Sequence, residues 1–98
     1  MTVLLLPPAA EDLQEIYDYY ESCRAGLGDR MLDEFRRGVE HILERPNAWQ
    51  SIDDTFRQYR LKRFPYGIIY HISHSTNEIV IVTVTHLSRE PGWWRDRT

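Results

Sequence analysis

The sequence is poor in cysteine and in long apolar runs. One cysteine, Cys23, is present among 98 residues, which excludes an internal disulfide and a cysteine-based zinc site. No apolar run approaches the roughly 20 residues that a membrane-spanning helix needs. The apolar run at positions 3–6 is too short for a signal peptide and no basic residue precedes it, so we expect a cytoplasmic protein without a membrane segment.

Signatures of several common chemistries are also absent. Gly26 and Gly28 precede an expected helix but do not complete a glycine-rich phosphate loop. Ser88 and Cys23 have no evident partners for a nucleophilic triad. The histidines have no recognised zinc spacing, although two of them lie close together (His41, His71, His74 and His86). We therefore expect neither a metal nor a cofactor.

What is present indicates one folded domain whose charge is divided between two halves. The hydrophobic share of 42% and the aromatic share of 12% are those of a folded chain, so residues 1–98 are expected to form a single domain. Residues 1–55 hold five basic and twelve acidic side chains, a balance of −7, whereas residues 56–98 hold seven and three, a balance of +4. This division indicates either an anionic partner met by one face or a helical half that is acid-rich for solubility.

Residues 56–86 predict three adjacent antiparallel strands. β-branched and aromatic residues fill three segments, and turn chemistry separates them at positions 64–67 and again at 73–77. Arg60 and Lys62 lie two apart in the first segment, so both side chains are expected on one side of that strand as a basic row. His86 ends the last segment.

Two amphipathic helices are predicted before these strands. Apolar residues recur at helical spacing over positions 9–23, where Asp12 falls near the start and suits the helix dipole. They recur again over positions 31–43, and Asp29 can cap that second helix through its carboxylate.

The elements together predict an α+β fold. Val3–Leu6 is an apolar run without alternation, which predicts a first strand buried on both faces. Residues 46–55 are expected to form a polar loop in which Trp49 covers the core edge. The expected architecture is a two-helix hairpin packed on one face of a four-stranded, mostly antiparallel sheet, in the order β-α-α-β-β-β.

Basic and aromatic residues of the second half suggest chemistry on phosphodiesters. Arg60, Lys62 and Arg89 would stabilise charge on phosphate oxygens. His86 could exchange a proton near neutral pH, and Trp93 could stack a splayed base. Each has an ordinary alternative: the solvated face of an edge strand, a capped surface histidine, and tryptophans that seal a core edge.

Several motifs occur in the same order as in one known superfamily. They are LPPAAEDLQEIYDYY at positions 6–20, Phe35, Ile42, Arg60-Leu61, YGIIY at positions 66–70, HLSREP at positions 86–91 and Trp93. With these motifs, which span nearly the whole chain, the sequence resembles the RelE/ParE superfamily, the toxin halves of type II toxin–antitoxin modules. The resemblance implies a strand, a helical hairpin and a three-stranded meander.

The resemblance leaves two branches open. RelE-like members cut messenger RNA in the ribosomal A site, and the catalytic set would then be Arg60, Lys62, His86 and Arg89. ParE-like members poison DNA gyrase instead and are not enzymes, and the target-binding set would be Arg60, Lys62, Tyr66, Arg89, Trp93 and Trp94. Gly67 stands where the nuclease branch has an arginine, and Trp93 stands near its terminal tyrosine, so the ParE branch is favoured.

A third interpretation is a degenerate toxin that only binds its antitoxin. In every case the resemblance implies a cognate antitoxin, with DNA gyrase or the ribosome and its mRNA as target and with growth inhibition and plasmid stabilisation as outcomes. A homodimer or a toxin–antitoxin heterotetramer would fit this role. We expect the antitoxin on the sheet edge and on the exposed apolar part of the helical hairpin, and the basic half favours an acidic partner.

Overall fold

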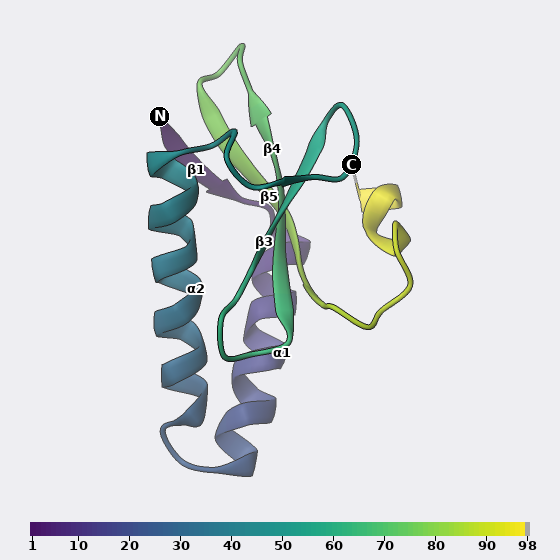
Figure 1. The fold of residues 1–98 in the computed structure, drawn as a ribbon. Coiled ribbons are helices and arrows are strands. Elements are labelled where there is room, and N and C mark those ends of the chain that lie inside the picture. The colour runs from purple at the N-terminus through teal and green to yellow at the C-terminus, as the bar shows by residue number, and fades with distance from the viewer. Residues whose placement is uncertain (98) are drawn as a thin grey trace.

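Two helices form a hairpin against one face of a sheet (Figure 1). The computed structural model describes residues 1–97, in which α1 (Pro7–Cys23) and α2 (Leu27–Glu44) follow a short first strand. The predicted apolar stripes are confirmed, because Ile16, Met31 and Ile42 are buried in the core between hairpin and sheet. Within the described residues, no helix is long and apolar enough to cross a membrane.

The N-terminus of α2 is capped from α1, so the predicted cap by Asp29 is wrong. The helix begins at Leu27, after Gly26 with a left-handed φ of 89°, and Asp29 already lies in its first turn. The carboxylate of Glu21 accepts hydrogen bonds from the backbone N–H groups of Gly26 (3.2 Å), Gly28 (2.8 Å) and Asp29 (3.3 Å). A carboxylate from the preceding helix thus satisfies N–H groups that a helix start leaves unpaired.

The sheet has five strands in the order β1-β5-β4-β3-β2, one more than predicted. The strands β3 (Phe56–Arg60), β4 (Tyr66–Ser73) and β5 (Glu78–His86) form the predicted antiparallel meander. The additional strand, β2 (Gln50–Ser51), pairs with β3 inside the segment predicted as a loop. Two residues are too few for strand alternation to appear in a sequence.

The first strand lies at an edge of the sheet, so its prediction as a fully buried strand is wrong. β1 (Thr2–Leu5) pairs in parallel with β5 and has no neighbour on its other side within residues 1–97. Leu4 is exposed, whereas Val3 and Leu5 are half-buried. An apolar run does not reveal which strand ends a sheet, and an edge strand offers its free backbone groups to another chain.

Both faces of the central strand β5 are buried, which creates two apolar cores. Residues 79–85 are buried without a break. The larger core lies under the helical hairpin, and Trp49 covers its edge as predicted, with its ring 4.7 Å from that of Tyr59. The smaller core lies on the opposite face of the sheet.

A short C-terminal helix covers the smaller core. This 3-10 helix, η1 (Trp93–Arg97), brings the Trp94 ring to 4.7 Å from that of Phe56. The buried cluster is completed by Ile69, Val80 and Val82. Trp94 is only 3% exposed. Its prediction as a target contact is therefore wrong, because it fills a core, which is the alternative that the sequence left open for paired tryptophans.

Candidate functional site

Three of the predicted site residues meet where β4 and β5 end. Tyr66 and His86 are paired across the two strands, and their rings form a T-shaped contact with centroids 5.0 Å apart. Arg89 follows His86 after a turn, and all three side chains line a hollow of about 210 Å³ closed on one side by α1. Burial raises the pKa of Tyr66, so its hydroxyl stays protonated at neutral pH and is able to donate a hydrogen bond.

The ring of His86 is oriented by its own turn. Its Nδ1 atom accepts a hydrogen bond from the backbone N–H of Ser88 at 3.1 Å and lies 2.7 Å from the Ser88 hydroxyl oxygen. Because Nδ1 acts as an acceptor, the neutral ring carries its hydrogen on Nε2. Nε2 of the neutral His86 ring is therefore a hydrogen-bond donor, whereas a general base would need a free lone pair on this atom.

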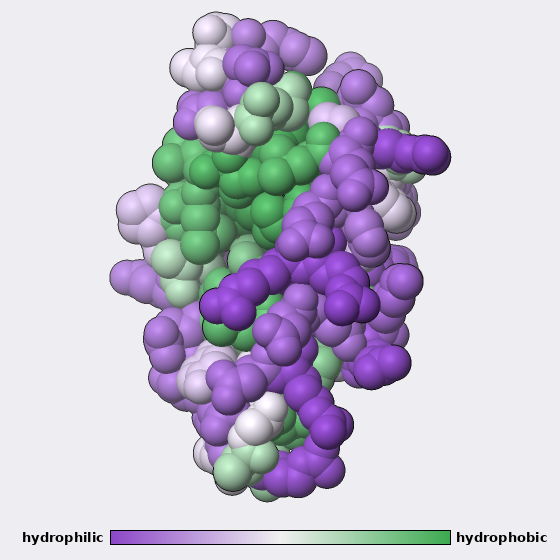
Figure 2. Space-filling model, turned by 90° about the vertical axis from the view of Figure 1, so that its left-hand side faces the viewer, coloured by the Kyte–Doolittle hydropathy of each residue, from purple (hydrophilic) through white to green (hydrophobic). Residues whose placement is uncertain are grey.

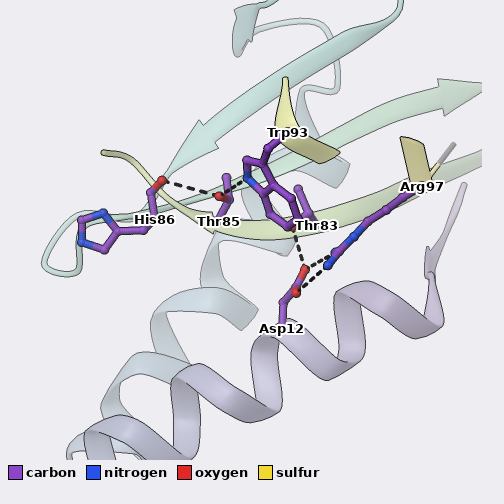
Figure 3. A network of polar contacts seen from close by, with 6 residues as sticks. All are labelled: Asp12, Thr83, Thr85, His86, Trp93 and Arg97. Carbon is purple, nitrogen blue, oxygen red and sulfur yellow. Dashed lines mark hydrogen bonds and ion pairs between the residues drawn. The ribbon is translucent and has the colours of Figure 1, made fainter. Parts of the chain in front are cut away.

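Arg89 is held by stacking on a tryptophan. Its guanidinium carbon lies 3.4 Å from the centroid of the Trp93 ring, and that of Arg97 lies 4.5 Å from the same centroid. The Trp93 indole N–H donates to the Thr85 hydroxyl at 2.8 Å, as Figure 3 shows. A base that stacked on Trp93 would first have to displace a guanidinium group, so the ring positions cations and is not an open stacking platform.

A half-buried carboxylate anchors the helix that supplies Trp93. Asp12 of α1 accepts hydrogen bonds from the Thr83 hydroxyl at 2.6 Å and from both terminal nitrogens of Arg97 at 2.5 and 3.1 Å (Figure 3). Helix α1 begins at Pro7, before the predicted start, so Asp12 lies past the first turn and the helix-dipole role predicted for it is wrong. Sequence reasoning missed this tie because Asp12 and Arg97 are 85 positions apart.

The predicted basic row on β3 does not exist. The strand ends at Arg60, which lies exposed beside Gly67 of β4. Lys62 and the next residue, Arg63, belong to the following turn, where their backbone N–H groups donate to a carboxylate oxygen of Glu34 at 3.1 and 3.0 Å. Alternation therefore stops before Lys62, and this side chain lines a different hollow from His86.

No group that would hold a metal ion occurs in the part of the chain that the structure describes. Three polar side chains at the strand ends, Tyr66, His86 and Arg89, are hydrogen-bond donors or cations, and the carboxylates of Asp12 and Glu15 on α1 line the same hollow. The donors and cations can bind an anionic or carbonyl-rich surface beside these two carboxylates.

Comparison with known proteins agrees with this architecture. A family model described as the ParE toxin of the type II toxin–antitoxin system parDE matches residues 3–91. The chain belongs to the ParE toxin family. No curated protein sequence matches it significantly.

Two solved structures share the ParE-type fold of this chain. A structure of a chromosomal ParDE system from P. aeruginosa is 22% identical over 90% of this chain and 97% of that one, with a TM-score of 0.78. The isolated E. coli RelE toxin is 12% identical over 97% of this chain and 93% of that one, with a TM-score of 0.68. The predicted α+β class and the membership of the RelE/ParE superfamily are thus confirmed.

Proposed function

We propose that this ParE family member is the toxin of a type II toxin–antitoxin module that inhibits DNA gyrase in the cytoplasm. The observation that carries the proposal is the ParE family match over residues 3–91. The site supports it, because a donor-and-cation surface suits a binding protein that traps its target. Gly67 supplies no cation at the strand ends, and Nε2 of the neutral His86 ring carries a hydrogen, whereas a nuclease base would need a free lone pair.

The proposed gyrase contact is the strand-end surface formed by Arg60, Tyr66, Arg89 and Trp93. Purified protein should inhibit supercoiling of relaxed plasmid by gyrase and should accumulate cleaved DNA. Arg89→Ala should weaken inhibition at least several-fold, since it removes the cation stacked on Trp93. Arg24→Ala, which removes an exposed arginine from the turn between the helices, is the matched control and should inhibit like wild type. Unchanged supercoiling at micromolar excess of toxin would refute gyrase as the target.

A second candidate, a RelE-like ribosome-dependent endoribonuclease, draws on the hollow shared by Tyr66, His86 and Arg89. It predicts mRNA cleavage on programmed ribosomes that His86→Ala and Arg60→Ala abolish. Cleavage that survives both changes would remove these side chains from the mechanism. Harmless overexpression without an antitoxin would instead favour the degenerate toxin that only binds its partner.

The proposed antitoxin surface lies at the β1 edge. The side of the molecule that carries β1 and α2 shows a broad apolar area bordered by polar side chains (Figure 2). Next to β1, a hollow of about 240 Å³ between the helices is lined by Leu5, Leu13, Tyr17 and Leu32. An antitoxin segment could extend the sheet at β1 while its apolar side chains fill this hollow.

Paired variants test this surface. Leu4→Lys puts a charge on the β1 edge, and Ile52→Lys puts the same charge on an exposed apolar residue after β2. Co-expression of the cognate antitoxin should neutralise wild type and Ile52→Lys, but not Leu4→Lys. Equal neutralisation of both variants would exclude the β1 edge. Light scattering on the wild-type complex would then distinguish a heterotetramer from other assemblies.

A further inference from the structure

A second surface, lined by other residues than the hollow at the ends of β4 and β5, gathers positive charge. Arg30 and Arg37 of α2 and Lys62 and Arg63 of the β3–β4 turn line a hollow of about 690 Å³. Its apolar lining consists of Leu27, Tyr59 and Phe64. We call this the α2–turn groove. A hollow of this size accommodates a segment of another molecule.

The cations of the α2–turn groove are not neutralised locally. Ion pairs within residues 1–97 join Arg36 to Asp33, Arg95 to Asp53 and Arg97 to Asp12, and none involves the four cations of the groove. Of the acidic residues in the lining, Asp33 is paired with Arg36, and Glu34 accepts the backbone N–H groups of the turn. The groove therefore keeps a positive potential that favours an anionic ligand.

The net charge of the chain and the apolar lining of the groove distinguish between anionic ligands. The formal net charge of −3 opposes general binding of nucleic acid. A polypeptide can place apolar side chains over Leu27 and Phe64 and carboxylates beside the arginines. We propose that the α2–turn groove binds an acidic polypeptide segment that also carries apolar side chains.

The acidic segment bound in the α2–turn groove would be separate from an antitoxin strand that extends the sheet at β1. The groove uses Arg30 and Arg37 of α2, whereas the hollow beside β1 uses Asp29 and Leu32. At 3.6 residues per turn these two pairs lie on opposite flanks of the helix. Binding in the groove can therefore be measured without any antitoxin, and its failure would leave the proposed toxin function unaffected.

The test uses a short fluorescein-labelled peptide of glutamates with a leucine at every third position. Fluorescence anisotropy should show binding to wild type that weakens with added salt. The double variant Arg30→Gln/Lys62→Gln should bind the peptide about tenfold more weakly, because two cations that attract its carboxylates are removed and each is partly screened by solvent. The double variant Arg24→Gln/Arg45→Gln removes the same charge from exposed sites outside the groove and should bind like wild type.

Three outcomes would overturn the proposal. The first is no binding of the acidic peptide at millimolar concentration. The second is an equal loss of affinity in both double variants, which would show a response to net charge alone. The third is tighter binding of an oligothymidine of matched charge, lost on Arg30→Gln/Lys62→Gln, which would assign the groove to nucleic acid. Matching thermal unfolding of the two double variants excludes misfolding as the cause of a lost affinity.

Discussion

Removing the carboxylate of Asp12 should destabilise the whole domain, because it joins α1, β5 and η1. The side chain of Asp12 is 14% exposed and that of Arg97 is 24% exposed, while Thr83 is fully buried. Asp12→Ala leaves the Thr83 hydroxyl without its acceptor, which costs about 1–3 kcal/mol. The lost two-bond pair with Arg97, reduced for its partial exposure, costs about 1 kcal/mol more. The free energy of unfolding should fall by about 3 kcal/mol, and Tm by roughly 15 °C.

Urea unfolding followed by tryptophan fluorescence measures this loss, and a double-mutant cycle tests its cause. Thr83→Val should be costly alone but nearly neutral in the Asp12→Ala background, because the orphaned hydroxyl is then gone. The coupling should be about 1 kcal/mol or more. Glu15→Ala removes an exposed carboxylate from the same helix and should change stability by less than about 0.5 kcal/mol. Additive effects of Asp12→Ala and Thr83→Val, or a cost of Asp12→Ala below about 1 kcal/mol, would refute the reasoning.

Three further predictions concern acid stability, helix packing and capping. Hydrogen bonds from two backbone N–H groups, and then from an arginine, lower the pKa of Asp53 from 3.8 to about 2. The charged carboxylate therefore stabilises the folded state fully above pH 3.8, and this contribution is lost as the pH falls toward 2. Asp53→Asn should therefore flatten the loss of stability over that range, and an unchanged acid profile by circular dichroism would contradict this. Gly38→Ala places a Cβ 2.8 Å from a Tyr59 ring carbon and should cost about 1–3 kcal/mol in urea unfolding, whereas a neutral result would show that the ring moves freely. Glu21→Ala removes the cap of α2 and should cost about 1–2 kcal/mol in the same assay, clearly more than Glu11→Ala at an exposed site of α1.

The fold was predictable where the pattern of apolar residues is long and places them on one face of an element. Helical spacing placed both helices, and the turns at Pro65 and at positions 73–77 separated the strands of the meander. The errors have physical reasons. β2 is too short for a pattern, and the cap of α2 comes from Glu21, whose carboxylate reaches N–H groups across the inter-helix turn. Capping rules that consider only the adjacent residues do not include such a partner.

The site was predictable only for residues brought together by strand pairing. His86 and Tyr66 meet because β4 and β5 are antiparallel and in register, which a meander implies. Lys62 was misplaced because β3 ends two residues earlier, where Glu34 fixes the turn. The tie of Asp12 to the C-terminal helix depends on tertiary contact alone, and a sequence carries no local signal for it.

The packing around Gly67 bears on whether this chain is similar to the nuclease branch, which has an arginine at that position. A Cβ at this position would lie 3.2 Å from Cγ of Gln58 and 3.2 Å from Cδ2 of Leu87, closer than ordinary van der Waals contact. A side chain at the position where the nuclease branch would place an arginine would therefore require Gln58 and Leu87 to shift by a few tenths of an ångström. Since His86 is also held with Nδ1 as an acceptor, two independent features disfavour cleavage chemistry at the same strand ends. A surface of fixed donors and a stacked arginine remains, and it is suited to holding a macromolecular target.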